Sequence, residues 1–136
     1  MILLDTVVVS ELRKARPSPH VLAWLRGQRE GDVFLSVVTI GEIERGIVKV
    51  GEPQFAQALT RWLEDLLRFY GDRVLPVTAD IARRWGRYSA DLGHEGADLL
   101  IAATAASHRL TVATRNVRHF APTGVAVLDP FKPSGV

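Results

Sequence analysis

The amino-acid sequence predicts an α/β protein, a three-layer α/β/α sandwich in which helices cover both faces of a central parallel sheet. The first observation is that short, mainly apolar segments, such as residues 2–4 and 33–38, have the composition of strands buried on both faces of a sheet. The second is that segments with apolar residues at helical spacing lie between these strands. Strands and helices that alternate with short connections are typical of a parallel sheet.

In the first half of the chain, Asp5 ends an apolar strand and Gly31-Asp32 turns the chain before a second one. The β-branched triplet that begins at Val7 leaves the segment after Asp5 open between helix and extended chain. The expected elements are a strand over 2–4, a helix or extended piece over 7–14, a helix over 19–29, a strand over 33–38 and a helix over 39–50.

In the second half, Pro53 suits the first turn of the longest predicted helix, and Thr78 suits a helix N-cap. Pro76 restricts its segment to an edge strand or to no strand. The expected elements are a helix over 54–70, an extended piece over 73–77, a helix from Thr78 to Gly93, a buried helix over 97–108, a strand over 110–113, a helical turn over 116–120 and a strand over 125–128.

Composition limits the class of protein. The 136 residues predict a single domain over 1–136, and 47% hydrophobic with 24% charged residues excludes a disordered chain. The absence of cysteine excludes disulfides, thiolate metal sites and a cysteine nucleophile. No signal peptide or membrane-spanning segment is recognisable, so we expect a cytoplasmic protein without membrane association. The net charge is +2, and most of the 17 basic residues are arginine. This composition weakly favours an acidic partner such as nucleic acid.

Polar side chains gather where the predicted strands end. Asp5 follows the first strand, Glu42 lies in the first turn of the helix after the second, Asp98 opens the buried helix, and Asn116 follows the next strand. Ligand sites of open parallel sheets form outside the carboxyl ends of the strands. If the three carboxylates converge there, they need a cation, and oxygen ligands favour Mg²⁺ or Mn²⁺.

Each of these residues also has a purely structural interpretation. Asp5 can turn the chain after the strand, and Asp98 can complement the positive end of its helix. Thr39-Ile-Gly-Glu42 fits a capping box, in which the glutamate only bonds back to the N-cap amide. Asn116 is typical of a turn or cap.

The remaining charged residues carry less information. We interpret the four histidines as surface residues without ligand spacing: His20, His94, His108 and His119. Arg115 and Arg118 lie beside the predicted pocket and are candidates for binding phosphate, and hence nucleic acid. Arg83, Arg84 and Arg87 form a basic face of the kind that is usually only solvated.

Several motifs in this order resemble those of PIN-domain ribonucleases, and most closely those of VapC toxins of the FitB-like branch. The resemblance runs essentially end to end and includes the closing Val-Ala-Val-Leu-Asp-Pro-Phe. The motifs that carry it are Met-Ile-Leu-Leu-Asp5-Thr6 with Ser10-Glu11, Leu35-Ser-Val-Val-Thr-Ile-Gly-Glu42 with Gly46, Ala97-Asp98-Leu-Leu-Ile-Ala-Ala-Thr-Ala105, and Leu110-Thr-Val-Ala-Thr114-Arg115-Asn116.

The resemblance implies a PIN-like fold and Mg²⁺- or Mn²⁺-dependent endonucleolytic cleavage of RNA. It also implies a homodimer and a small VapB-like antitoxin as partner. The acidic constellation of the family falls on Asp5, Glu42 and Asp98, which would be catalytic and bind the metal. Its fourth acidic position falls on Asn116, and the hydroxyls of Thr6 and Thr114 would line the site.

One departure from the family pattern motivates an alternative function. Val7 stands where the family usually has an asparagine that would help to orient the site. Together with Asn116, it leaves open a catalytically weakened PIN-fold binding module. A receiver-type phosphoacceptor domain is a further alternative, but it needs paired acids after the first strand, and Asp5-Thr6 supplies no pair.

The long amphipathic helix over 54–70 also has two interpretations. Its apolar stripe packs into the core, or it forms a hairpin with the preceding helix that grips a dimer mate or an antitoxin helix. The stripe consists of Phe55, Leu59, Trp62, Leu63, Leu66 and Tyr70.

Overall fold

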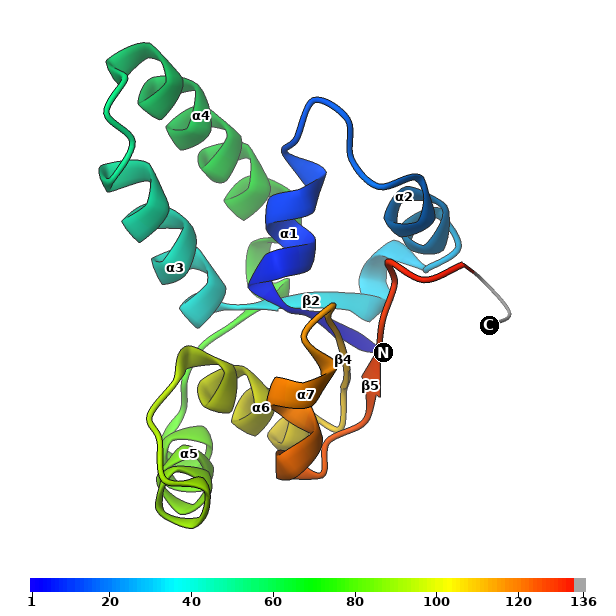
Figure 1. Cartoon of the computed structure of the whole chain (residues 1–136), viewed down its shortest axis with the longest axis vertical. Coiled ribbons are helices and arrows are strands. Elements are labelled where there is room, and N and C mark those ends of the chain that lie inside the picture. Colours follow the sequence, from blue (N-terminus) through cyan, green and yellow to red (C-terminus); the bar gives the residue numbers. More distant parts are fainter. Residues whose placement is uncertain (134–136) are drawn as a thin grey trace.

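A five-stranded parallel sheet in the order β3-β2-β1-β4-β5 forms the centre of the computed structural model, which describes residues 1–133 (Figure 1). The last three residues of the predicted domain, 134–136, lie outside the described residues. The strands are β1 (Ile2–Leu4), β2 (Val33–Ser36), β3 (Val74–Leu75), β4 (Thr111–Ala113) and β5 (Val127–Leu128). Receiver domains have the strand order 2-1-3-4-5, so the receiver alternative is wrong.

Helices lie on both sides of this sheet, which confirms the predicted α/β/α architecture (Figure 1). The helices are α1 (Thr6–Leu12), α2 (Pro19–Arg26), α3 (Val37–Val48), α4 (Pro53–Tyr70), α5 (Ala79–Leu92), α6 (Ala97–His108) and α7 (Val117–Phe120). Short 3-10 turns occupy Glu30–Asp32, Gly71–Arg73 and Ala121–Thr123.

The alternation of side chains along β1 divides the core in two. Ile2 and Leu4 face one cluster, which α1, α2 and Tyr70 of α4 complete. Leu3 faces the other, which is built from α6 and from Phe120 of α7. Because both faces of β1 are covered, the strand is apolar throughout, and the first polar side chain after it stands at the carboxyl edge of the sheet.

The junction between β2 and α3 differs from the prediction. We expected the strand to reach Val38 and the helix to start at Thr39, but the strand ends at Ser36. The Ser36 side chain accepts a hydrogen bond from the Val38 amide at 3.0 Å and caps the helix, so α3 starts at Val37. This local bond outweighs the β propensity of the two valines.

Other boundaries agree more closely. Pro53 occupies the first turn of α4, Thr78 caps α5 through the Ile81 amide, and Gly93 ends α5 with a left-handed backbone, all as predicted. The segment after Asp5, left open by the sequence, is helical, whereas α2 stops at Arg26, before the predicted residue 29. β3 is an edge strand beside Pro76, as the proline indicated.

Within residues 1–133, no helix is both long and apolar enough to cross a membrane.

Candidate active site

Asp5 lies at the carboxyl end of β1 and caps α1. Its side chain is 6% exposed, and its two oxygens accept hydrogen bonds from the Thr6 amide and from the Thr114 hydroxyl, both at 2.8 Å. Burial raises the pKa of this carboxyl above the ordinary Asp value, and the nearby charges of Glu42 and Asp98 raise it further, while the two hydrogen bonds oppose the shift. Asp5 is therefore a buried carboxylate whose charge is stabilised only in part.

Glu42 comes to the same edge of the sheet from α3. Its Oε1 accepts a hydrogen bond of 2.6 Å from the Thr6 hydroxyl, whose oxygen lies 3.0 Å from the Thr39 hydroxyl. Because Thr6 has one hydroxyl proton and gives it to Glu42, Thr39 donates to Thr6. The capping-box interpretation is wrong, since Ser36 is the N-cap of α3 and Glu42 lies beyond the first turn. The carboxylate instead faces Thr6, with Arg45 at 3.8 Å from its other oxygen.

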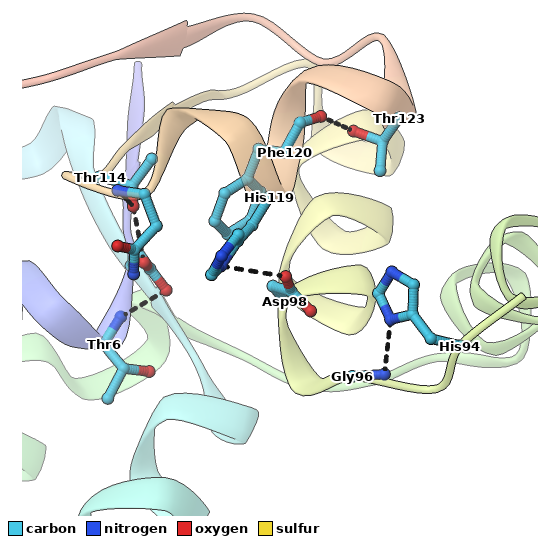
Figure 2. A network of polar contacts seen from close by, with 10 residues as sticks. Thr6, His94, Gly96, Asp98, Thr114, His119, Phe120 and Thr123 are labelled. Carbon is cyan, nitrogen blue, oxygen red and sulfur yellow. Dashed lines mark hydrogen bonds and ion pairs between the residues drawn. The ribbon is translucent and has the colours of Figure 1, made fainter. Parts of the chain in front are cut away.

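Asp98 approaches from the opposite side, in the first turn of α6. One of its oxygens lies 3.7 Å from Nδ1 of His119, on α7. Figure 2 shows Thr6 and Thr114 on one side of this region and Asp98 on the other, with the His119 ring between them in this view. Sequence reasoning treated His119 as a surface residue; its side chain is 62% exposed, but it faces a site carboxylate. The only hint in the sequence that His119 belongs to the site is its position between the candidate site residue Asn116 and the apolar Phe120.

All three carboxylates line one cleft of about 570 Å³. The lining is Asp5, Thr6, Val7, Ser10, Glu42, Ala97, Asp98, Ile101, Asn116, His119 and Phe120. Within residues 1–133, no three Asp, Glu, His or Cys side chains are arranged closely enough to hold a metal ion. A cation between the acids would therefore require their side chains to rotate toward one another.

The other predicted site residues take supporting positions or lie apart. The backbone amide of Asn116 donates to the Thr114 hydroxyl oxygen at 2.9 Å, which fixes the loop after β4 behind Asp5. Arg115 does not line the cleft, because its guanidinium carbon lies 3.8 Å from the centre of the Phe131 ring. Arg118 is exposed and also lies outside the lining. Phosphate contact by either arginine stays a prediction.

Comparison with known proteins adds independent findings. The family model of the PIN domain matches residues 2–124. The chain is 35% identical to VapC ribonuclease Y4jK of Sinorhizobium fredii, over 98% of this chain and 100% of the relative. It is 37% identical to Toxin FitB of Neisseria gonorrhoeae, over 96% and 99%.

Solved structures agree with these relatives. The crystal structure of FitAcB from Neisseria gonorrhoeae superposes with a TM-score of 0.87 at 37% identity, over 96% of this chain and 99% of that one. A structure of FitAB bound to a DNA fragment gives a TM-score of 0.86 at 36% identity, over 97% and 96%. The fold, the sequence match and the cleft at the carboxyl edge of the sheet agree with one another. The chain belongs to the PIN-domain family.

Proposed function

We propose that this protein is an endoribonuclease and the toxin of a toxin–antitoxin pair. The observation that carries the proposal is the convergence of Asp5, Glu42 and Asp98, from three separate elements, on one cleft at the carboxyl edge of the sheet. The relatives named as VapC ribonuclease and as toxin, which match nearly the whole chain, support the reaction class.

We further propose Mg²⁺ or Mn²⁺ as the cofactor, held by Asp5, Asp98 and Glu42. The donor chemistry fits, since these ligands are all hard oxygens. Burial is the main reason that the pKa of Asp5 is raised, and the nearby charges of Glu42 and Asp98 add to the shift. When bound, the cation would neutralise the carboxylates and lower the pKa of an attacking water.

The side chains of this protein would orient the reaction. Thr6 and Thr114 hold the Asp5 carboxylate from two sides, and the Thr6 hydroxyl fixes Glu42, which would position the water. Attack on phosphorus in line with the departing 3′ oxygen, which takes up the proton released by the water, would leave a 5′ phosphate and a 3′ hydroxyl. The ribose 2′ hydroxyl takes no part in these steps, so a preference for RNA would have to come from binding, as with splayed bases in a loop.

A small antitoxin is the proposed protein partner. Solved structures similar to this chain include a toxin–antitoxin complex from Klebsiella pneumoniae, at 25% identity and a TM-score of 0.68. We also propose action in the cytoplasm and a homodimer. Light scattering after size-exclusion chromatography would show a dimer, and a monomer at all concentrations would exclude it.

The decisive experiment compares Asp5→Asn with Asp91→Asn, an exposed acid on α5 outside the cleft. We expect cleavage of RNA by the wild type to require added Mg²⁺ or Mn²⁺, to vanish in Asp5→Asn and to persist in Asp91→Asn. Sequencing of the product ends would identify the 5′ phosphate. Undiminished metal-dependent cleavage by Asp5→Asn would refute the assignment.

A binding module that does not cleave is the second candidate, because Val7 lines the cleft at a position where the resemblance to the family implies an asparagine. Titration calorimetry with Mn²⁺ separates the two. The nuclease binds the ion through Asp5 and Asp98, and the affinity falls in Asp5→Asn, whereas the binding module shows no heat of binding.

A further inference from the structure

A second, mainly apolar groove of about 160 Å³ adjoins the acidic cleft, between α1, α3 and α4. The two hollows share Thr6, Ser10 and Glu42. Aliphatic side chains of α3 form one wall, and the rings of Phe55 and Trp62 on α4 form the other. The groove is therefore continuous with the candidate active site.

The aromatic wall presents an exposed ring on a fixed backbone. Phe55 is 45% exposed although it is large and apolar. Its amide donates a 2.7 Å hydrogen bond to the Glu52 carboxylate, which caps α4 and fixes this first turn. A ring held on a rigid turn beside a polar cleft loses little conformational freedom when a flat ligand stacks on it.

The α1 side of the groove is polar and basic. Thr6, Ser10 and Arg13 are spaced so that they follow one face of the helix and its C-cap. At about 1.5 Å per residue, the backbone from Thr6 to Arg13 advances roughly 10 Å along the helix axis. Arg13 is exposed and forms no ion pair with any residue in 1–133, in contrast to Arg45, which lies 3.8 Å from Glu42.

We propose that this groove is a nucleobase subsite for single-stranded RNA next to the bond that is cut. A base stacks against Phe55 at the groove wall, and Arg13 binds a phosphate of the same strand, which runs along α1 away from the acids. Aromatic rings beside a basic track are the features by which proteins hold single strands, and an unpaired base is needed to enter such a groove. This inference rests on the proposed function and specifies how its substrate is held.

The test measures RNA binding without divalent metal, by fluorescence anisotropy, and then KM and kcat with Mg²⁺, on a cleavable oligonucleotide. Phe55→Ala is compared with Phe69→Ala, since Phe69 is a somewhat more exposed ring at the other end of α4, 57% exposed. We expect Phe55→Ala to weaken RNA binding and raise KM roughly 5- to 100-fold, the range that the loss of one stacked base gives, while Phe69→Ala leaves both unchanged.

The charged end of the subsite has its own control. Arg13→Ala should weaken binding and make the slope of log affinity against log salt shallower by about 0.7, the value for one phosphate contact on a single strand. Arg83→Ala, which removes an exposed arginine from α5, should change neither.

An abasic scan of the oligonucleotide decides which ligand occupies the groove. Removal of one particular base should weaken binding to the wild type but weaken binding to Phe55→Ala no further. If removal of that base weakened binding to the wild type and to Phe55→Ala equally, the subsite would be overturned. It would also be overturned if Phe55→Ala changed only self-association or antitoxin binding. A wild type that neither binds nor cleaves any RNA would refute the proposed function itself.

Discussion

The hydroxyl of Thr6 donates a 2.6 Å hydrogen bond to the carboxylate of Glu42, while the Thr6 amide donates to Asp5. One residue thus fixes two acids that come from different elements. Asp5 precedes Thr6 directly, but Glu42 arrives from the second turn of another helix. The Thr6 side chain orients Glu42, whereas Asp5 is held by the Thr6 backbone amide and by the Thr114 hydroxyl.

Replacement of Thr6 by valine tests that dependence. Thr6→Val keeps the shape but removes the donor to Glu42 and leaves the buried Thr39 hydroxyl without its acceptor. We expect Mn²⁺ affinity, measured by calorimetry, to fall roughly 10- to 100-fold, as for the loss of a group that orients a metal ligand. Thr6→Ser retains the hydroxyl and should bind nearly as tightly as the wild type; equal affinity in Thr6→Val would contradict the role.

The raised pKa of Asp5 predicts a pH dependence of stability. The folded protein holds the Asp5 proton more tightly than the unfolded chain, so its free energy of unfolding falls as the pH rises from the ordinary Asp pKa through the raised one. Asp5→Asn removes this fall. In urea titrations with EDTA, the stability of the variant relative to the wild type should therefore increase with pH over that window. A difference that is constant with pH would show that Asp5 carries no such penalty.

The lowered pKa of Glu11 predicts a pH dependence of stability with the opposite sign. Hydrogen bonds from Lys14 and from the Ser18 amide, each 2.8 Å long, lower the pKa of this carboxyl. Its contribution to stability is present above the ordinary Glu pKa and is lost as the pH falls through the lowered one. Glu11→Gln should lower the free energy of unfolding at neutral pH by about 1.5–3 kcal/mol.

The difference between Glu11→Gln and wild type should shrink in acid, as followed by urea denaturation at several pH values. Lys14→Ala is the control: it removes the half-exposed partner but leaves the Ser18 amide bonded, so it should lower stability by no more than about 1 kcal/mol. An equally large effect of Lys14→Ala would place the stabilisation in the ion pair instead.

Val7 offers a gain-of-function test. The side chain lines the acidic cleft and also packs against the core, so Val7→Asn introduces an amide at the edge of the site. We expect tighter Mn²⁺ binding and faster RNA cleavage, together with a small loss of thermal stability from the lost apolar packing. Unchanged metal affinity in a folded Val7→Asn protein would show that this position does not orient the acids.

The sequence alone determined which edge of the molecule carries the acidic cleft. Apolar strands that alternate with helices predict a parallel sheet, and the carboxyl ends of parallel neighbours lie at one edge. Asp5 and the polar residues that follow β4 were therefore expected to lie together, and β1 and β4 are parallel neighbours. The first-turn proline Pro53 and the N-cap Thr78 were also predictable, because they act on the backbone within one helical turn.

Only the tertiary structure decided what each side chain touches. Thr39-Ile-Gly-Glu42 satisfies a capping-box pattern, yet Ser36 is the N-cap and α3 starts earlier than that pattern predicts. The Glu42 carboxylate instead accepts a hydrogen bond from the Thr6 hydroxyl on α1. His119 likewise faces Asp98 only because α7 packs beside α6. Such contacts join elements distant in the chain, and their geometry follows from how helices pack on the sheet, which local patterns do not encode.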